Sequence, residues 1–220
     1  MENTGTNYKK IAMTMLAMVT WFALLLQLKL SLESTATTGF SNTKTVINFF
    51  SYFTILSNCL VAVSLSASLI IPSSAAGMFF SKPAVMSAIA VYIFIVGLVY
   101  NLLLRGIWEP TGWQLVADNL LHVAVPVFYI LFWGIFTPAG QLQWRTILPW
   151  LLFPLIYLVY SLVRGPIANW YPYPFLDAAK FGYGQVAINS ILVLVAFLAT
   201  SLGAVAFNRR GRNTAIKTRS

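Results

Sequence analysis

Charged side chains are scarce in this sequence. Asp, Glu, Lys and Arg make up 9% of its 220 residues, whereas 59% are apolar and the mean hydropathy is +0.77. Soluble domains contain about 25% charged residues on average, so a water-soluble globule of this composition would not cover its own surface. The composition therefore favours a protein of the lipid bilayer and excludes disordered and collagen-like chains.

Cysteine and histidine are nearly absent as well. Cys59 is the single cysteine, so no disulfide can form within the chain. His122 is the single histidine and there are only five acidic residues, which excludes a His- or Cys-rich zinc site. The sequence also lacks the G-x-S-x-G elbow, the H-E-x-x-H helix and the phosphate-binding glycine loop. We therefore expect no metal and no organic cofactor.

Long apolar runs are what the sequence has instead. A membrane-spanning helix needs about 20 mostly apolar residues, and six stretches meet or approach this length. They cover residues 11–30, 47–71, 83–104, 115–136, 145–163 and 185–207. We predict an all-α integral membrane protein, a single-domain bundle of six transmembrane helices followed by a basic tail at 208–220. The first stretch is too long for a signal-peptide core, so we expect it to be retained.

The distribution of lysine and arginine predicts the orientation of this bundle. With a cytoplasmic N-terminus, nine cations fall inside, namely Lys9, Lys10, Lys82, Arg145, Arg209, Arg210, Arg212, Lys217 and Arg219. Five fall outside, namely Lys29, Lys44, Arg105, Arg164 and Lys180. We therefore expect both termini in the cytoplasm and the basic tail against anionic lipid. The net charge of +9 then needs no nucleic-acid partner.

Polar side chains gather in the outer halves of the predicted helices. Polar groups inside hydrocarbon are costly, and the ionisable ones are functional by default. The polar residues of these outer halves are Thr54, Ser57, Asn58, Tyr100, Asn101, Arg105, Asp118, Asn119, His122, Tyr157, Tyr160, Ser161, Arg164, Gln185 and Asn189. If the second, fourth and sixth helices pack around one centre, these side chains form a polar pocket that opens outward or into the outer leaflet. The apolar inner halves suit an acyl chain.

Thr54 and His122 stand at one predicted depth in this pocket. Each lies about seven residues below the start of its predicted helix, or about 10 Å. A neutral histidine beside a threonine hydroxyl can act as a general base. Asp118, four residues before His122, shares its helix face and can orient the imidazole. Two structural alternatives stay open: Thr54 bonding its own helix backbone, and Asp118 pairing with Arg105 or Arg164.

The loop between the fifth and sixth predicted helices is rich in aromatic residues. It reads Asn169-Trp170-Tyr171-Pro172-Tyr173-Pro174-Phe175, and its prolines forbid a regular helix. Tryptophan and tyrosine are enriched where a membrane meets water. We therefore favour an interfacial anchor, with a lid over the pocket as the alternative.

Three runs carry a resemblance to a known family: FSYFTILSN at 50–58, DNLLHVAVP at 118–126 and YPYPFLD at 171–177. With these runs, nearly the whole chain resembles bacterial six-transmembrane relatives of the androgen-induced protein family, which includes the androgen-dependent regulator of tissue factor pathway inhibitor. The resemblance implies hydrolysis of fatty acid esters of hydroxy fatty acids by an intramembrane threonine nucleophile and a histidine. These two residues fall on Thr54 and His122, and the implied location is a bacterial inner or plasma membrane.

We therefore expect a lipid-ester hydrolase whose partners are its lipid substrate and membrane lipids. Animal members tend to carry Asn in place of Asp118 and a second His in place of Asn119, which puts the substrate in question. The residues expected to orient groups, hold the oxyanion or line the pocket are Asp118, Asn58, Ser57, Asn101, Arg105, Asn119, Tyr157 and Asn189. The alternative is a lipid- or solute-binding or transport protein that uses the same pocket without covalent chemistry. A purely structural membrane partner is a third, weaker alternative.

Overall fold

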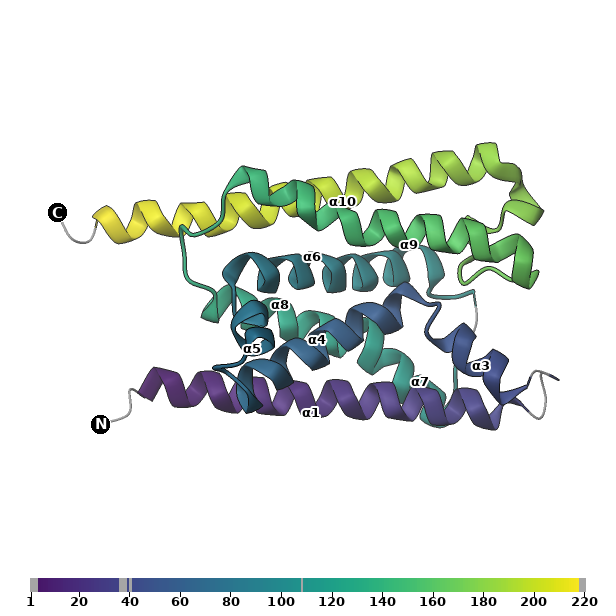
Figure 1. Ribbon diagram of the computed structural model, residues 1–220, viewed down its shortest axis with the longest axis horizontal. Coiled ribbons are helices and arrows are strands. Elements are labelled where there is room, and N and C mark those ends of the chain that lie inside the picture. Colours follow the sequence, from purple (N-terminus) through teal and green to yellow (C-terminus); the bar gives the residue numbers. More distant parts are fainter. Residues whose placement is uncertain (1–3, 36–38, 40, 108, 218–220) are drawn as a thin grey trace.

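The computed structural model describes residues 4–35, 39, 41–107 and 109–217 of the chain, with the backbone alone at 4 and 211–217. In this part of the chain, six helices are long and apolar enough to cross a membrane (Figure 1). They cover Gly5–Glu33, Phe53–Ile70, Pro83–Leu104, Gly112–Phe136, Trp144–Ala168 and Ala178–Arg210. The predictions of an all-α fold and of a multi-pass, six-helix membrane bundle are confirmed.

Several of these spans are built from more than one helical element. The α-helices are α1 (Thr4–Glu33), α3 (Asn42–Phe49), α4 (Phe53–Ile70), α5 (Ala75–Phe80), α6 (Pro83–Val99), α7 (Gly112–Asn119), α8 (Val125–Phe136), α9 (Ile147–Ala168) and α10 (Ala178–Lys217). Two π-helical segments, Tyr100–Leu104 and Leu120–Ala124, continue α6 and join α7 to α8. Short 3₁₀ turns cover Trp144–Thr146 and Pro174–Leu176.

The central helix of the bundle is α6. It packs against α4, α8 and α10, while α1 closes one side by packing on α4, α7 and α8 (Figure 1). On the other side α9 packs against α10. Successive spans run in opposite directions, so the first turn of α1 and the last turn of α10 lie at the same end of the bundle (Figure 1). The loop between α9 and α10 lies at the opposite end.

The second predicted span, 47–71, is not one helix. The chain leaves α3 and turns through Phe50, Ser51 and Tyr52 before α4 begins, with Tyr52 in an extended conformation. Two tyrosines of α9 provide hydrogen-bond partners for the polar groups of this turn. The Tyr157 hydroxyl donates to the Ser51 carbonyl at 2.9 Å, and the Tyr160 hydroxyl lies 2.7 Å from the Ser51 hydroxyl. Apolar run length alone does not reveal such a break, because a tertiary contact stabilises it.

This break corrects the depth estimated for Thr54. Thr54 is the second residue of α4 and lies in its first turn, so the prediction that it lies about seven residues inside a helix is wrong. The observed bounds of other spans also differ from the predicted ones, because helices continue beyond their most apolar part. For example, α10 begins at 178 rather than 185, with a kink at Gly182, where φ is +75°.

The positions of the two ends of the bundle give a test of orientation. We expect Asn169→Cys, in a Cys59→Ser background, to react with a membrane-impermeant maleimide in intact cells. The matched variant Gln143→Cys should react only after lysis, since Gln143 belongs to the loop between α8 and α9. This loop lies at the end of the bundle where α1 begins and α10 ends (Figure 1). Both native side chains are exposed. The reverse labelling pattern would contradict cytoplasmic termini.

Candidate active site

Thr54 is buried in the first turn of α4, directly against Tyr173 of the α9–α10 loop. The Thr54 N–H donates to the Tyr173 hydroxyl oxygen at 3.1 Å, and the Thr54 hydroxyl lies 3.2 Å from the same oxygen. Burial raises the pKa of Tyr173 to about 12, with the bonds from Thr54 acting in the opposite direction. The phenol is therefore protonated at neutral pH. It can donate to Thr54 Oγ1 and leave the threonine proton free for another acceptor.

The α9–α10 loop folds back over the bundle to bring Tyr173 there. Asn169 ends α9 in the left-handed conformation, with φ at 46°. Gly165, one turn earlier, lies so close to Tyr171 that an added Cβ would sit 1.9 Å from its ring. The Tyr173 ring stacks on Phe175 with centroids 5.3 Å apart. The loop thus contributes a buried wall of the site as well as aromatic surface.

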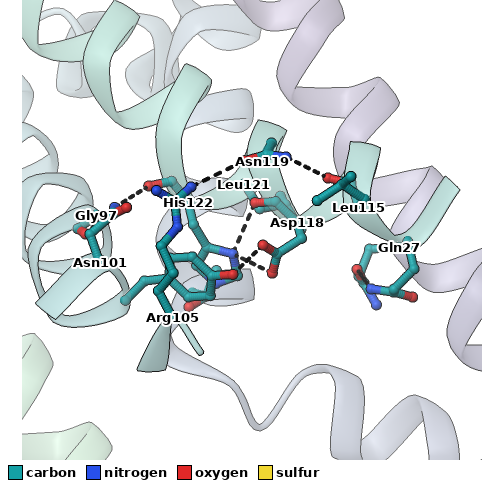
Figure 2. Close-up of polar contacts among 12 residues, drawn as sticks. Gln27, Gly97, Asn101, Arg105, Leu115, Asp118, Asn119, Leu121 and His122 are labelled. Carbon is teal, nitrogen blue, oxygen red and sulfur yellow. Dashed lines mark hydrogen bonds and ion pairs between the residues drawn. The ribbon is translucent and has the colours of Figure 1, made fainter. Parts of the chain in front are cut away.

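Asp118, His122 and Tyr100 form a second cluster, of which Figure 2 labels Asp118 and His122. His122 Nδ1 lies 3.2 Å from Asp118 Oδ1 and 3.0 Å from the Asp118 carbonyl oxygen. The Tyr100 hydroxyl donates to the other carboxylate oxygen, and its ring stacks on the imidazole with centroids 3.9 Å apart. Nδ1 faces two oxygen acceptors, and this geometry fits the tautomer that carries its proton on Nδ1, in which Nε2 can accept one. In the described part of the chain neither Arg105 nor Arg164 forms an ion pair with Asp118.

Both π-helical segments carry members of this cluster: Tyr100 begins the first, and His122 is the middle residue of the second. Such segments are frequent at functional sites. Pro126, which follows the second segment, has no N–H to offer the carbonyl groups of the preceding turn. Side-chain amides meet those carbonyl groups instead. Asn58 Nδ2 donates to the Leu121 carbonyl at 3.2 Å, and Asn101 Nδ2 lies 3.5 Å from the His122 carbonyl (Figure 2).

A single cavity of about 460 Å³ joins the two clusters. Thr54, Asp118, His122, Tyr100 and Tyr173 all line it. Thr54 and His122 both line this common space, and no hydrogen bond joins their side chains. A smaller apolar pocket of about 80 Å³ lies among α6, α9 and α10. It shares Thr54, Tyr100 and Tyr173 with the larger cavity, so Thr54 stands at the junction of the two.

The asparagines expected as oxyanion donors have other partners. Asn58 is fully buried, and its amide nitrogen donates to the Thr54 carbonyl at 2.8 Å as well as to Leu121. Asn101 is exposed, and its amide nitrogen donates to the Gly97 carbonyl at 2.7 Å. Both N–H groups of Asn58 are therefore used to hold α4 against the segment that carries His122. Tyr173, rather than either asparagine side chain, lies against the Thr54 hydroxyl.

The other predicted site residues do not enter the larger cavity. Arg105 donates to Asn119 at 3.4 Å, and Asn119 donates to the Leu115 carbonyl (Figure 2). Tyr157 supports the turn before α4 and lines the apolar pocket. The remaining two are Ser57, which is buried, and Asn189, which donates to the Phe175 carbonyl.

Several residues that complete the site had no predicted role. Tyr100 and Tyr173 were noted only as polar or aromatic positions, yet they contact Asp118 and Thr54. Gln27 and Gln114 were not noted, and they bond each other at 2.8 Å across α1 and α7 in the wall of the cavity. A glutamine inside the first apolar run was the one local signal for this pair.

The bonds at Tyr173 can be tested by their contribution to stability. Tyr173→Phe leaves the buried Thr54 N–H without its acceptor, so we expect the free energy of unfolding to fall by about 1–3 kcal/mol. Tyr8→Phe, at an exposed position of α1, is the matched control and should leave it unchanged. Unfolding of the detergent-solubilised protein measures both. Parental stability of Tyr173→Phe would show that these bonds contribute nothing.

A comparison with protein-family models, with curated proteins and with solved structures gave no match for this chain. The six-helix membrane-spanning architecture is consistent with the resemblance drawn from the three sequence runs. A function for this site therefore rests on its geometry and on that resemblance.

Proposed function

We propose that this protein is an intramembrane hydrolase of lipid esters, with Thr54 as nucleophile and His122 as general base. One observation carries the proposal. Thr54 and His122 line the same cavity, and Asp118 occupies Nδ1 of the imidazole so that Nε2 serves as the base. The resemblance adds the substrate class, fatty acid esters of hydroxy fatty acids or related lipid esters, and a bacterial inner or plasma membrane. Membrane lipids surround the protein, and the chemistry uses no cofactor.

In the first half of the reaction, Thr54 Oγ1 attacks the ester carbonyl carbon while its proton passes to His122 Nε2. The carbonyl oxygen becomes an oxyanion as the new C–O bond forms. The tetrahedral intermediate then expels the alcohol, which takes the proton from His122. An acyl-threonine ester remains. Catalytic hydrogen bonds often tighten only once substrate is bound, so the lack of a direct Thr54–His122 bond is compatible with these roles.

In the second half, water enters the reaction. His122 removes a proton from the water as its oxygen attacks the acyl carbon, and the same proton then returns to Thr54 Oγ1 when the acyl–threonine bond breaks. The products are a fatty acid and the regenerated enzyme. Asp118 stabilises the imidazolium that forms in each half of the cycle. Tyr100, which donates to Asp118, fixes the carboxylate for this task.

Tyr173 is the best placed donor for the oxyanion. Its phenol lies against both the backbone and the hydroxyl of Thr54, and its raised pKa keeps the donor proton in place. The first turn of α4 adds backbone N–H groups that have no intrahelical acceptor. Preorganised donors of this kind are worth about 10²–10³ in rate in other acyl-transfer enzymes.

The nucleophile and its base act as one unit, so their losses should not add. We expect Thr54→Ala and His122→Ala each to reduce ester hydrolysis to near background, and the double variant to be barely worse than either. Thr54→Ser keeps a hydroxyl and should retain activity, whereas Thr54→Val keeps the shape and should have none. Hydrolysis of a long-chain ester in detergent measures all five proteins. Parental activity of Thr54→Val would reject the covalent mechanism and favour the binding or transport alternative.

A fluorophosphonate probe gives an independent check of the same assignment. Labelling of the parent should disappear in Thr54→Ala. Thr20→Ala is the matched control, because Thr20 is a buried threonine of α1 whose hydroxyl bonds the Leu16 carbonyl and which lines neither cavity. Labelling that survives in Thr54→Ala would mean that another residue is the nucleophile.

Asp118→Asn separates a catalytic role from a structural one. If the carboxylate orients His122 and stabilises its cation, turnover should fall by about 10²-fold or more while the fold persists. If it serves only as half of a buried pair, its removal should cost about 3–5 kcal/mol of stability with unchanged specific activity. Activity and thermal unfolding of the same preparation distinguish these results, and the second would reject the catalytic role.

A further inference from the structure

Arg164, near the end of α9, has a guanidinium group that the described residues only partly use. Its Nη2 donates to Asn48 Oδ1 of α3 at 2.5 Å, and its Cζ lies 5.0 Å from the centre of the Trp170 ring. Its Nη1 is buried and has no hydrogen-bond partner among the described residues. The last turns of α9 and the helix α3 lie at the same end of the bundle (Figure 1), and the bond between Arg164 and Asn48 joins them there.

No carboxylate of the described residues pairs with this cation. The ion pairs in this part of the chain join Lys29 to Glu33 and His122 to Asp118. Buried charges in proteins are normally paired and hydrogen-bonded, because a buried charge without a partner is costly. An anion from outside the chain would supply the partner that Arg164 lacks.

The guanidinium lies directly behind the wall of the larger cavity. Asn48 and Trp170, which it contacts, both line that cavity, whereas Arg164 itself does not. Because Nη1 is covered, a ligand in the cavity would reach it as the Asn48 side chain turns aside. That exchange replaces a neutral amide acceptor with a charged one, and charge-assisted hydrogen bonds are about twice as strong as neutral ones. The planar fork of an arginine also matches the geometry of a carboxylate.

The rest of the two cavities suits long hydrocarbon chains. The apolar lining residues of the larger cavity include Phe49, Ile55, Leu104, Ile107 and Leu121. At Thr54 this cavity meets the smaller pocket among α6, α9 and α10, whose lining includes Val96, Leu158 and Val193. Burial of methylene groups in either space is favourable. Together the two cavities fit a ligand with two apolar arms that meet at Thr54, one of which carries an anion to Asn48.

From these features we infer that Arg164 recognises the free carboxylate of the substrate, on the arm that carries the esterified hydroxyl. The inference rests on the proposed function, which places the scissile carbonyl at Thr54 and gives esters of hydroxy fatty acids as the substrate class. The acyl chain then lies in the apolar pocket, and the hydroxy-acid chain lies in the larger cavity with its carboxylate at Arg164. Arg164 contacts the substrate away from the reacting atoms, so it determines specificity and leaves the chemistry to Thr54 and His122.

Two substrates that differ in one charge test this inference: the palmitoyl ester of 12-hydroxystearic acid and the methyl ester of the same compound. With release of palmitate as the readout, we expect kcat/KM for the free acid to be higher by about tenfold or more, mainly through KM. Tenfold corresponds to about 1.4 kcal/mol. Arg164→Gln should bring the ratio of the two values close to one. Arg145→Gln, the same change at an exposed arginine in the 3₁₀ turn before α9, is the matched control and should keep the parental ratio. Equal kcat/KM for both substrates in the parent, or a parental ratio in Arg164→Gln, would overturn the inference.

Asn48→Asp tests the same charge while Arg164 stays in place. The new carboxylate has the size of the native amide and keeps its bond to Nη2, so the contact between α3 and α9 is retained. Because it pairs with the guanidinium, it should remove the preference for the free acid as completely as Arg164→Gln does. Arg164→Lys keeps the charge without the planar fork and should retain part of the preference. A parental ratio in Asn48→Asp would contradict recognition by Arg164, even if Arg164→Gln fails to fold.

Binding of an ether that cannot be hydrolysed separates this inference from the proposed function. In this ether a methylene group replaces the ester carbonyl of the free acid. We expect the detergent-solubilised protein to bind the tritiated ether about tenfold more tightly than its primary amide, and Arg164→Gln to bind both equally. If no ester is hydrolysed but this difference is found, the proposed function fails and recognition of the carboxylate stands. If esters are hydrolysed and the acid and the amide bind equally, recognition fails and the hydrolase stands.

A phospholipid phosphate is the other anion that could reach Arg164 from a membrane. Phosphatidylglycerol in mixed micelles tests it in the same binding assay. Binding of this lipid that depends on Arg164, without a preference for the ether acid over its amide, would assign the arginine to a lipid headgroup and overturn the inference.

Discussion

The site depends on the two hydrogen bonds that the Asn58 amide nitrogen donates. One reaches the Thr54 carbonyl in α4, and the other reaches the Leu121 carbonyl in the π-helical segment beside it. The second bond is needed because Pro126 removes a backbone donor just beyond that segment. Asn58 therefore joins the helix of the candidate nucleophile to the helix of the candidate base. Both N–H groups of this fully buried amide hold the two helices together, while its Oδ1 has no hydrogen-bond partner among the described residues.

Neutral donors compensate the buried carboxylate of the second cluster. Asp118 is 3% exposed, and it is held by a phenol and an imidazole rather than by an arginine. An arginine would neutralise the carboxylate outright. Held by Tyr100 and His122 instead, the carboxylate can stabilise the positive charge on the imidazole when that ring gains a proton. The Tyr100 ring stacks on the imidazole, so the same residue contacts both the carboxylate and the candidate base.

Local properties of the sequence predicted the membrane architecture, whereas tertiary contacts determined most of the site. The length of an apolar run is sufficient to identify a span, and six spans were identified in this way. The break before α4 was not predicted, because the Tyr157 and Tyr160 hydroxyls of another helix stabilise it. The position of Tyr173 was not predicted either, because it depends on the packing of Tyr171 on Gly165. Thr54 and His122 line one cavity although the depth that we estimated for Thr54 rested on a helix that begins later.

The burial of Tyr173 links Thr54 to the loop between α9 and α10. Thr54 is embedded among membrane helices, yet the group that contacts its hydroxyl belongs to a connecting loop between α9 and α10. The same loop supplies Trp170, Pro172 and Pro174 to the cavity wall. A change in the conformation of this loop would therefore alter the surroundings of the Thr54 hydroxyl without any change in the membrane-spanning helices.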